Sequence, residues 1–200
     1  MWFVGIDPSI TSTGFVILDE EGAVVHAEAI RMPSKWGKSP VWLVARNQRT
    51  VILSHIARSP SAVFSVAMEQ PLLRGNGALE RAGLFGVLVE ALGGVLAVAP
   101  SLLKKFATGD PFAKKDAIRL RVFKRWSFEH ESNDAVDAFV LAHMARAVHA
   151  FCADHGRLEE YLKAEVDVVE RLVLPRGGHR AQGRTGRVPN LSPEKRDEPM

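Results

Sequence analysis

The order of the apolar segments is the feature that most limits the folds open to this chain. Three short strand-like runs, over residues 2–7, 14–19 and 23–30, come first and are separated by turn residues. The segments that follow alternate between helical and strand-like spacing; we expect helices over residues 42–58, 78–92, 101–107, 114–125 and 133–152, and strands over residues 62–69 and 95–99. This order predicts an α/β domain with a mixed five-stranded sheet and helices on both faces, because antiparallel strands continue into parallel ones through crossover helices.

The C-terminal part of the chain extends beyond this pattern. We expect residues 1–153 to form the α/β domain, residues 154–174 to add one amphipathic helix starting at residue 158, and residues 175–200 to form a disordered tail. The tail contains six Lys or Arg residues against three Asp or Glu residues, so it carries the whole net charge of +3. Such a tail either binds a DNA backbone without sequence preference or has no role.

The composition is that of a globular protein, with 46% hydrophobic and 24% charged residues. No segment approaches the run of about 20 apolar residues that crosses a membrane, and the N-terminus lacks the basic and apolar regions of a signal peptide. A single cysteine, Cys152, excludes an intramolecular disulfide and disfavours a cysteine-rich metal site. We therefore expect a cytoplasmic protein without membrane contact.

Four carboxylates stand where a fold of this class does not need them. Asp7 and Glu69 each end an apolar strand, whereas Asp134 and Asp137 open an apolar helix and share one of its faces. The two strands are neighbours in the predicted sheet and the helix crosses near them, so we expect the four acids to lie together. A cluster of oxygen ligands suits Mg²⁺ or Mn²⁺. Two such ions about 3.5–4 Å apart catalyse phosphodiester hydrolysis.

Asp7 and Asp134 also have structural explanations. An Asp that precedes a proline, as Asp7 does, is often a turn former. Asp134 would suit the positive end of its helix, with Ser132 or Asn133 as the N-cap. Asp137 fits this explanation less well, because Ala, Val, Phe and Leu surround it in the sequence.

The segments that carry the acids resemble the three acidic motifs of the RuvC family of Holliday junction resolvases, in order and in spacing. The motifs are Gly5-Ile6-Asp7-Pro8-Ser9 with Thr13-Gly14-Phe15, then Met68-Glu69-Gln70-Pro71, and finally Asn133-Asp134-Ala135-Val136-Asp137-Ala138. The resemblance covers about residues 1–150. It implies an RNase H-like fold and a homodimer that cuts two strands of a four-way junction symmetrically with Mg²⁺ or Mn²⁺, two ions per active site. It also implies that Asp7, Glu69, Asp134 and Asp137 are the catalytic metal ligands.

Two lysine pairs resemble the segments that hold the family's two DNA-contacting, catalytically important lysines. They lie in Leu103-Lys104-Lys105 and Ala113-Lys114-Lys115. On this resemblance we assign the catalytic roles to Lys104 and Lys115, with an uncertainty of one residue, and DNA contacts to both pairs. A cation beside the scissile phosphate would stabilise developing charge. The alternative is an ordinary solvated helix face.

The loop after Glu69 departs from the family pattern. The family has an aromatic residue there that wedges at the junction centre, whereas this chain has Leu72 and Leu73. Aliphatic side chains also unstack bases, so we expect Leu72 and Leu73 to contact DNA. Arg74 in the same loop is either a phosphate contact or a solubilising residue.

Three alternative functions compete with this one. One is a flap, branched-DNA or RNA-processing nuclease of the same fold. The opening Gly-Ile-Asp segment also resembles the phosphate loop of actin-like ATPases and sugar kinases, but these need two copies of the fold, and 200 residues without a repeat do not supply them. A junction-binding protein without cleavage activity is the third, and the presence of all four acids argues against it.

Overall fold

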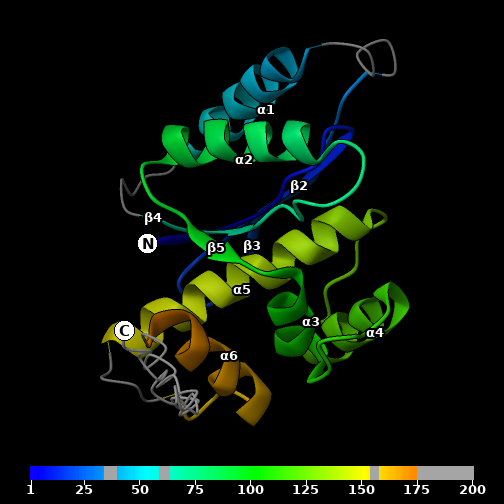
Figure 1. Cartoon of the computed structure of the whole chain (residues 1–200). Helices are drawn as coiled ribbons and strands as arrows, with labels where there is room; N and C mark the ends of the chain where they lie inside the picture. The colour runs from blue at the N-terminus through cyan, green and yellow to red at the C-terminus, as the bar shows by residue number, and fades with distance from the viewer. Residues whose placement is uncertain (34–39, 59–63, 154–157, 175–200) are drawn as a thin grey trace, which may run out of the picture.

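The sheet is mixed and five-stranded, as predicted. The computed structural model describes residues 1–33, 40–58, 64–153 and 158–174 (Figure 1). Its strands are β1 (Trp2–Asp7), β2 (Ser12–Leu18), β3 (Val24–Arg31), β4 (Phe64–Glu69) and β5 (Leu96–Val98). They lie in the order β3-β2-β1-β4-β5. The pairs β1–β2 and β2–β3 are antiparallel, and β1–β4 and β4–β5 are parallel.

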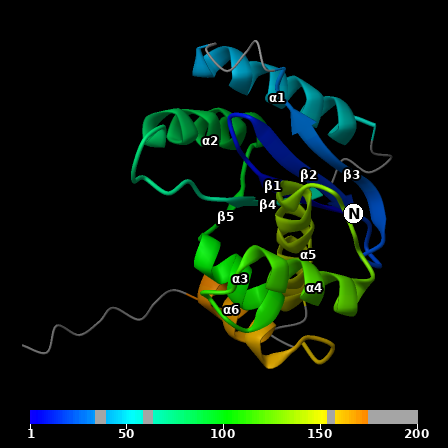
Figure 2. The ribbon, with the colours of Figure 1, turned by 90° about the vertical axis from the view of Figure 1, so that its right-hand side faces the viewer.

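Helices cover both faces of the sheet. They are α1 (Val41–Ile56), α2 (Ala78–Leu92), α3 (Pro100–Thr108), α4 (Lys115–Trp126), α5 (Asn133–Ala153) and α6 (Lys163–Val173). Figures 1 and 2 show α1 and α2 on one side of the sheet and α3 to α6 on the other. The arrangement confirms the predicted class, an α/β fold with helices on both faces.

The alternation of side chains along the strands divides the core into two layers. Val4 and Ile6 of β1 belong to the layer that contains buried residues of α1 and α2, such as Ile52 and Leu88. Phe3 of β1 faces the other layer, which α5 dominates. Asp7 follows Phe3 and Gly5 in the same alternation, so its side chain is on the α5 side of the sheet.

Helix α5 is the central helix of the second layer and lies directly against the sheet. By length and composition alone it would pass as a membrane span, but 61% of its most apolar window is buried inside the protein, as in the core helix of a globular fold. The approach to β1 depends on Gly5: a Cβ atom there would come within 3.0 Å of the backbone of Ala138 and Ala142. At Gly5 the backbones of α5 and β1 are therefore in contact with no side chain between them.

The C-terminal helix starts later than its sequence pattern predicts. We expected a helix over residues 158–174, whereas α6 begins at Lys163. A side-chain oxygen of Glu165 accepts a hydrogen bond from the Leu162 amide (2.9 Å), which fixes the helix start there. Val168 and Val169 are buried in the core layer of α3 and α5, so α6 packs on the domain. The predicted tail, residues 175–200, lies outside the described residues.

Candidate active site

Asp7 and Glu69 lie side by side at one edge of the sheet. They end β1 and β4, which are adjacent parallel strands with Ile6 opposite Met68, so the two carboxylates meet where both strands end. Beyond Glu69 the Gln70 amide donates a hydrogen bond to the Val98 carbonyl (2.9 Å). This bond continues the β4–β5 pairing and fixes the backbone that follows Glu69.

The start of α5 brings the other two acids to the same edge. Asp134 lies in the first turn and Asp137 one turn later. Ser132 Oγ accepts a hydrogen bond from the Asp134 amide (3.2 Å), so of the two predicted caps, Ser132 and Asn133, it is Ser132 that makes the capping bond. This bond caps the N-terminal end of α5, so neither the Asp134 nor the Asp137 carboxylate is needed as the cap.

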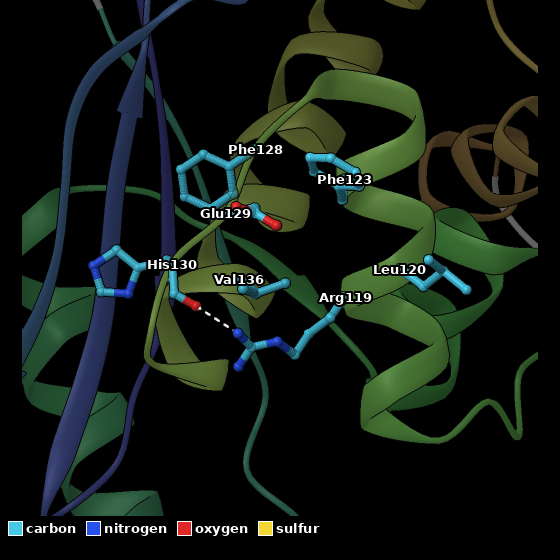
Figure 3. Close-up of a pocket in the computed structure, with 7 residues that line it drawn as sticks. All are labelled: Arg119, Leu120, Phe123, Phe128, Glu129, His130 and Val136. Carbon is cyan, nitrogen blue, oxygen red and sulfur yellow. Dashed lines mark hydrogen bonds between the residues drawn. The ribbon is translucent and has the colours of Figure 1, made fainter.

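Arg119 of α4 holds the segment that leads into α5. Its guanidinium donates hydrogen bonds to the carbonyl of His130 (3.0 Å), the carbonyl of Glu131 (3.3 Å) and Oδ1 of Asn133 (3.2 Å). Figure 3 shows the side chain reaching from α4 toward this segment, next to a pocket. The pocket is lined by Arg119, Leu120, Phe123, Phe128, Glu129, His130 and Val136. None of the four acids lines this pocket. We therefore regard its lining residues as part of the packing that supports α5, and not as part of the active site.

The acids lie close enough to change one another's protonation. Burial raises the pKa of Asp7 well above its ordinary value, and the charges of Glu69, Asp137 and Asp134 raise it further. Burial and then Asp137 raise the pKa of Glu69 to about 7. Burial also raises the pKa of Asp137 to about 6, with Asp134 adding to the effect. The site therefore concentrates more negative charge than its own cations neutralise.

Two lysines reduce this excess of negative charge. Lys115, the first residue of α4, lowers the pKa of Asp7, Glu69 and Asp137. Lys104 of α3 lowers the pKa of Glu69 and Asp137. Both assigned lysines therefore stand near the acids.

The other lysine of each pair has different surroundings. The Lys105 amino group forms an ion pair with Asp167 of α6 (3.1 Å), so it is engaged with the C-terminal helix. Lys114 is exposed just before α4. Lys104 and Lys115 are thus the members of the two pairs whose charges lower the pKa values of Glu69 and Asp137.

The cluster has the chemistry of a site for hard divalent cations. Its ligand atoms are all carboxylate oxygens, the set that suits Mg²⁺ or Mn²⁺. The one group of three potential ligand atoms within 4.8 Å of one another, among the residues that the structure describes, lies elsewhere and includes two histidines. No three ligand atoms of the four acids lie within 4.8 Å of one another.

The loop between β4 and α2 forms one wall of a cleft beside the acids. The cleft is lined by Asp7, Pro8, Glu69, Gln70, Pro71, Leu72, Arg74 and Arg81. Leu72 and Leu73 are 62% and 70% exposed, so their side chains are free to contact a ligand. Of the three loop residues predicted to contact DNA, Leu72 and Arg74 line the cleft and Leu73 does not.

Two residues that the sequence did not single out shape the site. Arg81 of α2 donates hydrogen bonds to the carbonyls of Leu72 (3.2 Å), Arg74 (3.0 Å) and Asn76 (3.0 Å), which fixes the loop. No sequence signal marks an arginine that binds loop carbonyls, and the same holds for Arg119.

Gln48 fixes the turn after Asp7. It is fully buried on α1, accepts a hydrogen bond from the Thr13 hydroxyl (2.7 Å) and donates one to the Ser9 carbonyl (2.8 Å). A signal for Gln48 was present in the sequence: it is a polar residue midway between Val44 and Ile52, at core spacing on one helix face.

Comparison with known proteins identifies the fold. No protein-family model and no curated protein sequence matches the chain. Among solved structures, the RuvC of T. thermophilus in complex with a Holliday junction substrate has a TM-score of 0.59 and 24% sequence identity, covering 78% of this chain and 96% of that one. A second structure of Thermus thermophilus RuvC gives a TM-score of 0.59 and 21% identity, covering 78% of this chain and 98% of that one. The chain thus has the RNase H-like fold of the RuvC structures, as the three motifs led us to expect.

Proposed function

We propose that the chain is a divalent-metal-dependent endonuclease that resolves four-way DNA junctions. One observation carries the proposal: the fold places Asp7, Glu69, Asp134 and Asp137 at one edge of the sheet with two lysines beside them. The fold is shared with a RuvC whose structure contains a Holliday junction substrate. The substrate is DNA, and we place the activity in the cytoplasm, away from membranes.

In this proposal the four carboxylates hold two Mg²⁺ or Mn²⁺ ions. The ligand set fits these ions because it offers only oxygens. The raised pKa values of Glu69 and Asp137 are consistent with it: burial is the main cause and neighbouring acids add to it, and a bound cation would favour the ionised carboxylates. When bound, a pair of such ions activates water and stabilises the leaving oxygen of a phosphodiester.

The other side chains then have separate roles. Lys104 and Lys115 stabilise the charge that develops on the scissile phosphate. Lys114 and Arg74, both exposed, hold neighbouring backbone phosphates. Leu72 and Leu73 insert between bases at the opening of the junction, as exposed aliphatic wedges do in other DNA-bending proteins.

Symmetric cleavage of two strands requires two active sites, so we propose that the protein acts as a homodimer. Leu79, at the start of α2, is 82% exposed, and this helix is apolar on more than one face. A second copy of the chain packed on α2 would bury that surface. The molar mass in solution, measured by sedimentation equilibrium, tests this directly.

One observation favours a second candidate function. The loop that faces the cleft presents Leu72 and Leu73 where the junction resolvases carry an aromatic wedge. A weaker wedge would select less sharply for four-way junctions. The second candidate is therefore a broader nuclease that acts on flaps, other branched DNA or structured RNA.

The deciding experiment compares substrates with the purified protein. A labelled four-way junction, a linear duplex, a flap and an RNA–DNA hybrid are each incubated with Mg²⁺, Mn²⁺ or EDTA. Paired, symmetric nicks confined to the junction and absent in EDTA support the resolvase. Equal cutting of flaps or hybrids selects the second candidate, and cutting that persists in EDTA contradicts both.

A further inference from the structure

A second cluster of potential ligands lies away from the four acids. It comprises His26 and Glu28 of β3 and His55 in the last turn of α1. Oε2 of Glu28 lies 3.3 Å from Nε2 of His26 and 3.5 Å from Nε2 of His55. All three ligand atoms lie within 4.8 Å of one another. Three donors from two distant segments therefore converge on one point.

This cluster is on the opposite face of the sheet from the acids. Glu28 pairs with Phe15 and His26 pairs with Ile17. Directly paired residues share a face, and Phe15 and Ile17 belong to the core layer of α1 and α2. Asp7 is on the α5 face. The sheet therefore separates the two clusters, so they cannot share an ion.

The spacing of the donors matches a tetrahedral transition-metal site. Zinc binds imidazole nitrogen and carboxylate oxygen at about 2.0–2.2 Å. Two ligands of a tetrahedral ion at that distance are about 3.3–3.6 Å apart. The two separations from Oε2 of Glu28, 3.3 and 3.5 Å, fall in this range, and without an ion the shorter one is a hydrogen bond between Glu28 and His26. Two histidines and one carboxylate also form a common zinc ligand set that leaves a fourth position for water.

The surroundings hold the two imidazole rings in place. The rings of His26 and His55 stack with centroids 4.0 Å apart, and each packs against Phe15 at 5.7 Å.

The three side chains are also accessible to an ion from solution. The side chains of His26, His55 and Glu28 are 29%, 19% and 41% exposed. This is enough for an ion to enter and for water to complete its coordination. The exposed fractions are also low enough for the surrounding packing to hold the three side chains in place.

We propose that His26, Glu28 and His55 bind a Zn²⁺-class transition-metal ion that fastens the end of α1 to the edge strand β3. The ion is distinct from those of the nuclease site in ligand type, preferred metal and position. It links two elements whose ligands, Glu28 and His55, are 27 residues apart in the sequence. Its role is to brace the α1–β3 side of the domain.

The test is a titration of the metal-free full chain with Co²⁺ in excess Mg²⁺, which occupies the carboxylate site. The expected result is the visible absorption of four-coordinate Co²⁺, saturating at one equivalent and abolished by Zn²⁺. Loss of a residue that merely orients a metal ligand weakens affinity about 10- to 100-fold. We therefore expect His55→Ala and Glu28→Gln to weaken Zn²⁺ binding at least about 100-fold, and Zn²⁺ to raise the melting temperature of the unsubstituted chain alone.

The controls separate this site from other possible ones. His149 and Cys152 are exposed and lie one turn apart on α5, so the double variant His149→Ala/Cys152→Ser tests whether that pair holds the ion. Asp7→Asn should keep Zn²⁺ binding and lose nuclease activity, which makes failure of one proposal distinguishable from failure of the other. If His55→Ala fails to fold, the Zn²⁺ affinity of Glu28→Gln decides whether the site exists.

Three results would overturn the proposal. The first is absence of the Co²⁺ absorption from the unsubstituted chain. The second is Zn²⁺ binding by folded Glu28→Gln as tight as that of the unsubstituted chain. The third is loss of binding in the double control variant alone.

Discussion

The backbone of Gly14 lies directly under the carbonyl group of Asp134. A Cβ atom on Gly14 would come within 3.0 Å of that carbonyl oxygen, of its carbon and of the Ala135 nitrogen. Gly14 also pairs with Asp7 in the β1–β2 register. A single close approach between β2 and α5 therefore fixes where the helix acids stand relative to the strand acid.

Gly14→Ala should displace the start of α5, because the atoms that a methyl group would meet belong to the backbone and cannot rotate away. Overpacking of this kind destabilises a protein by about 1–3 kcal/mol. Chemical denaturation measures this loss, and junction cleavage should fall with it. The matched control is Gly86→Ala on α2, where a Cβ atom meets nothing within 4 Å. Replacing that helical glycine should leave stability unchanged or raise it by about 0.5–1 kcal/mol. Equal stability of the two variants would contradict the close-approach argument.

Stability of the metal-free protein should fall as the pH rises from about 4 to above about 7. The folded-state pKa values of Glu69 and Asp137, about 7 and about 6, exceed their ordinary values of 4.5 and 3.8. The folded state therefore binds more protons than the unfolded state in this window, and ionisation of the two acids opposes folding. Thermal melting from pH 4 to 8 in EDTA measures the slope.

Mg²⁺ should remove most of this loss at the upper end of the range, because it binds the ionised acids. The double variant Glu69→Gln/Asp137→Asn should show a flatter pH profile and little response to Mg²⁺. A melting curve that is independent of Mg²⁺ at pH 8 in the unsubstituted chain would count against a metal site at the acids.

Asp7→Asn should abolish cleavage while leaving junction binding largely intact. Its carboxylate is proposed as a metal ligand, so we expect a rate at least about 100-fold lower. The amide removes one of the charges that repel each other, so the metal-free variant should melt at a higher temperature than the unsubstituted chain at pH 8. Single-turnover cleavage, gel-shift binding and melting are the measurements. Loss of binding to the same degree as cleavage would mean that Asp7 has a structural role.

Lys115→Ala should slow the chemical step about 10²- to 10³-fold, the range for removal of one group that stabilises developing charge. Lys105→Ala is the matched control, because the Lys105 amino group pairs with Asp167 on α6. Its loss should affect stability slightly and cleavage little. Single-turnover rates at saturating protein separate the two, and similar rates for both variants would contradict the assignment of Lys115.

Arg81→Lys should loosen the loop that carries Leu72 and Leu73 while keeping the charge. A lysine cannot reproduce the fork of donors with which Arg81 binds three loop carbonyls. We expect the preference for junctions over flaps to fall more than the cleavage rate itself. The ratio of the two rates in one competition assay is the readout, and an unchanged ratio would show that the loop is positioned without Arg81.

The sequence was sufficient for the order of helices and strands along the chain and for the positions of the four acids at strand and helix ends, because both depend on local patterns. Apolar alternation ends at Asp7 and at Glu69, and the i, i+3 spacing of Asp134 and Asp137 places them on one helix face. These patterns can be identified in the sequence without knowledge of tertiary contacts.

The supporting contacts could not be predicted, because they depend on how distant elements meet. Arg81 and Arg119 bind carbonyls of loops, which have no periodicity to reveal them. His26 and Glu28 share a strand face by alternation, but only the position of α1 over β3 brings His55 to them. The start of α6 was misplaced because amphipathic spacing extends beyond the residue at which Glu165 caps the helix.

The two edge strands of the sheet differ in how readily they could pair with another molecule. The edge strand β5 has three residues and offers few unpaired backbone groups, whereas the edge strand β3 has eight residues. In the part of the chain that the structure describes, β3 pairs with β2 alone, and Val24 and Val25 at its start are 44% and 47% exposed. A long, partly apolar border strand is a template for addition of a strand from another molecule. Aggregation of a destabilised variant would therefore begin at β3, where His26, Glu28 and Arg31 are the polar residues that oppose it.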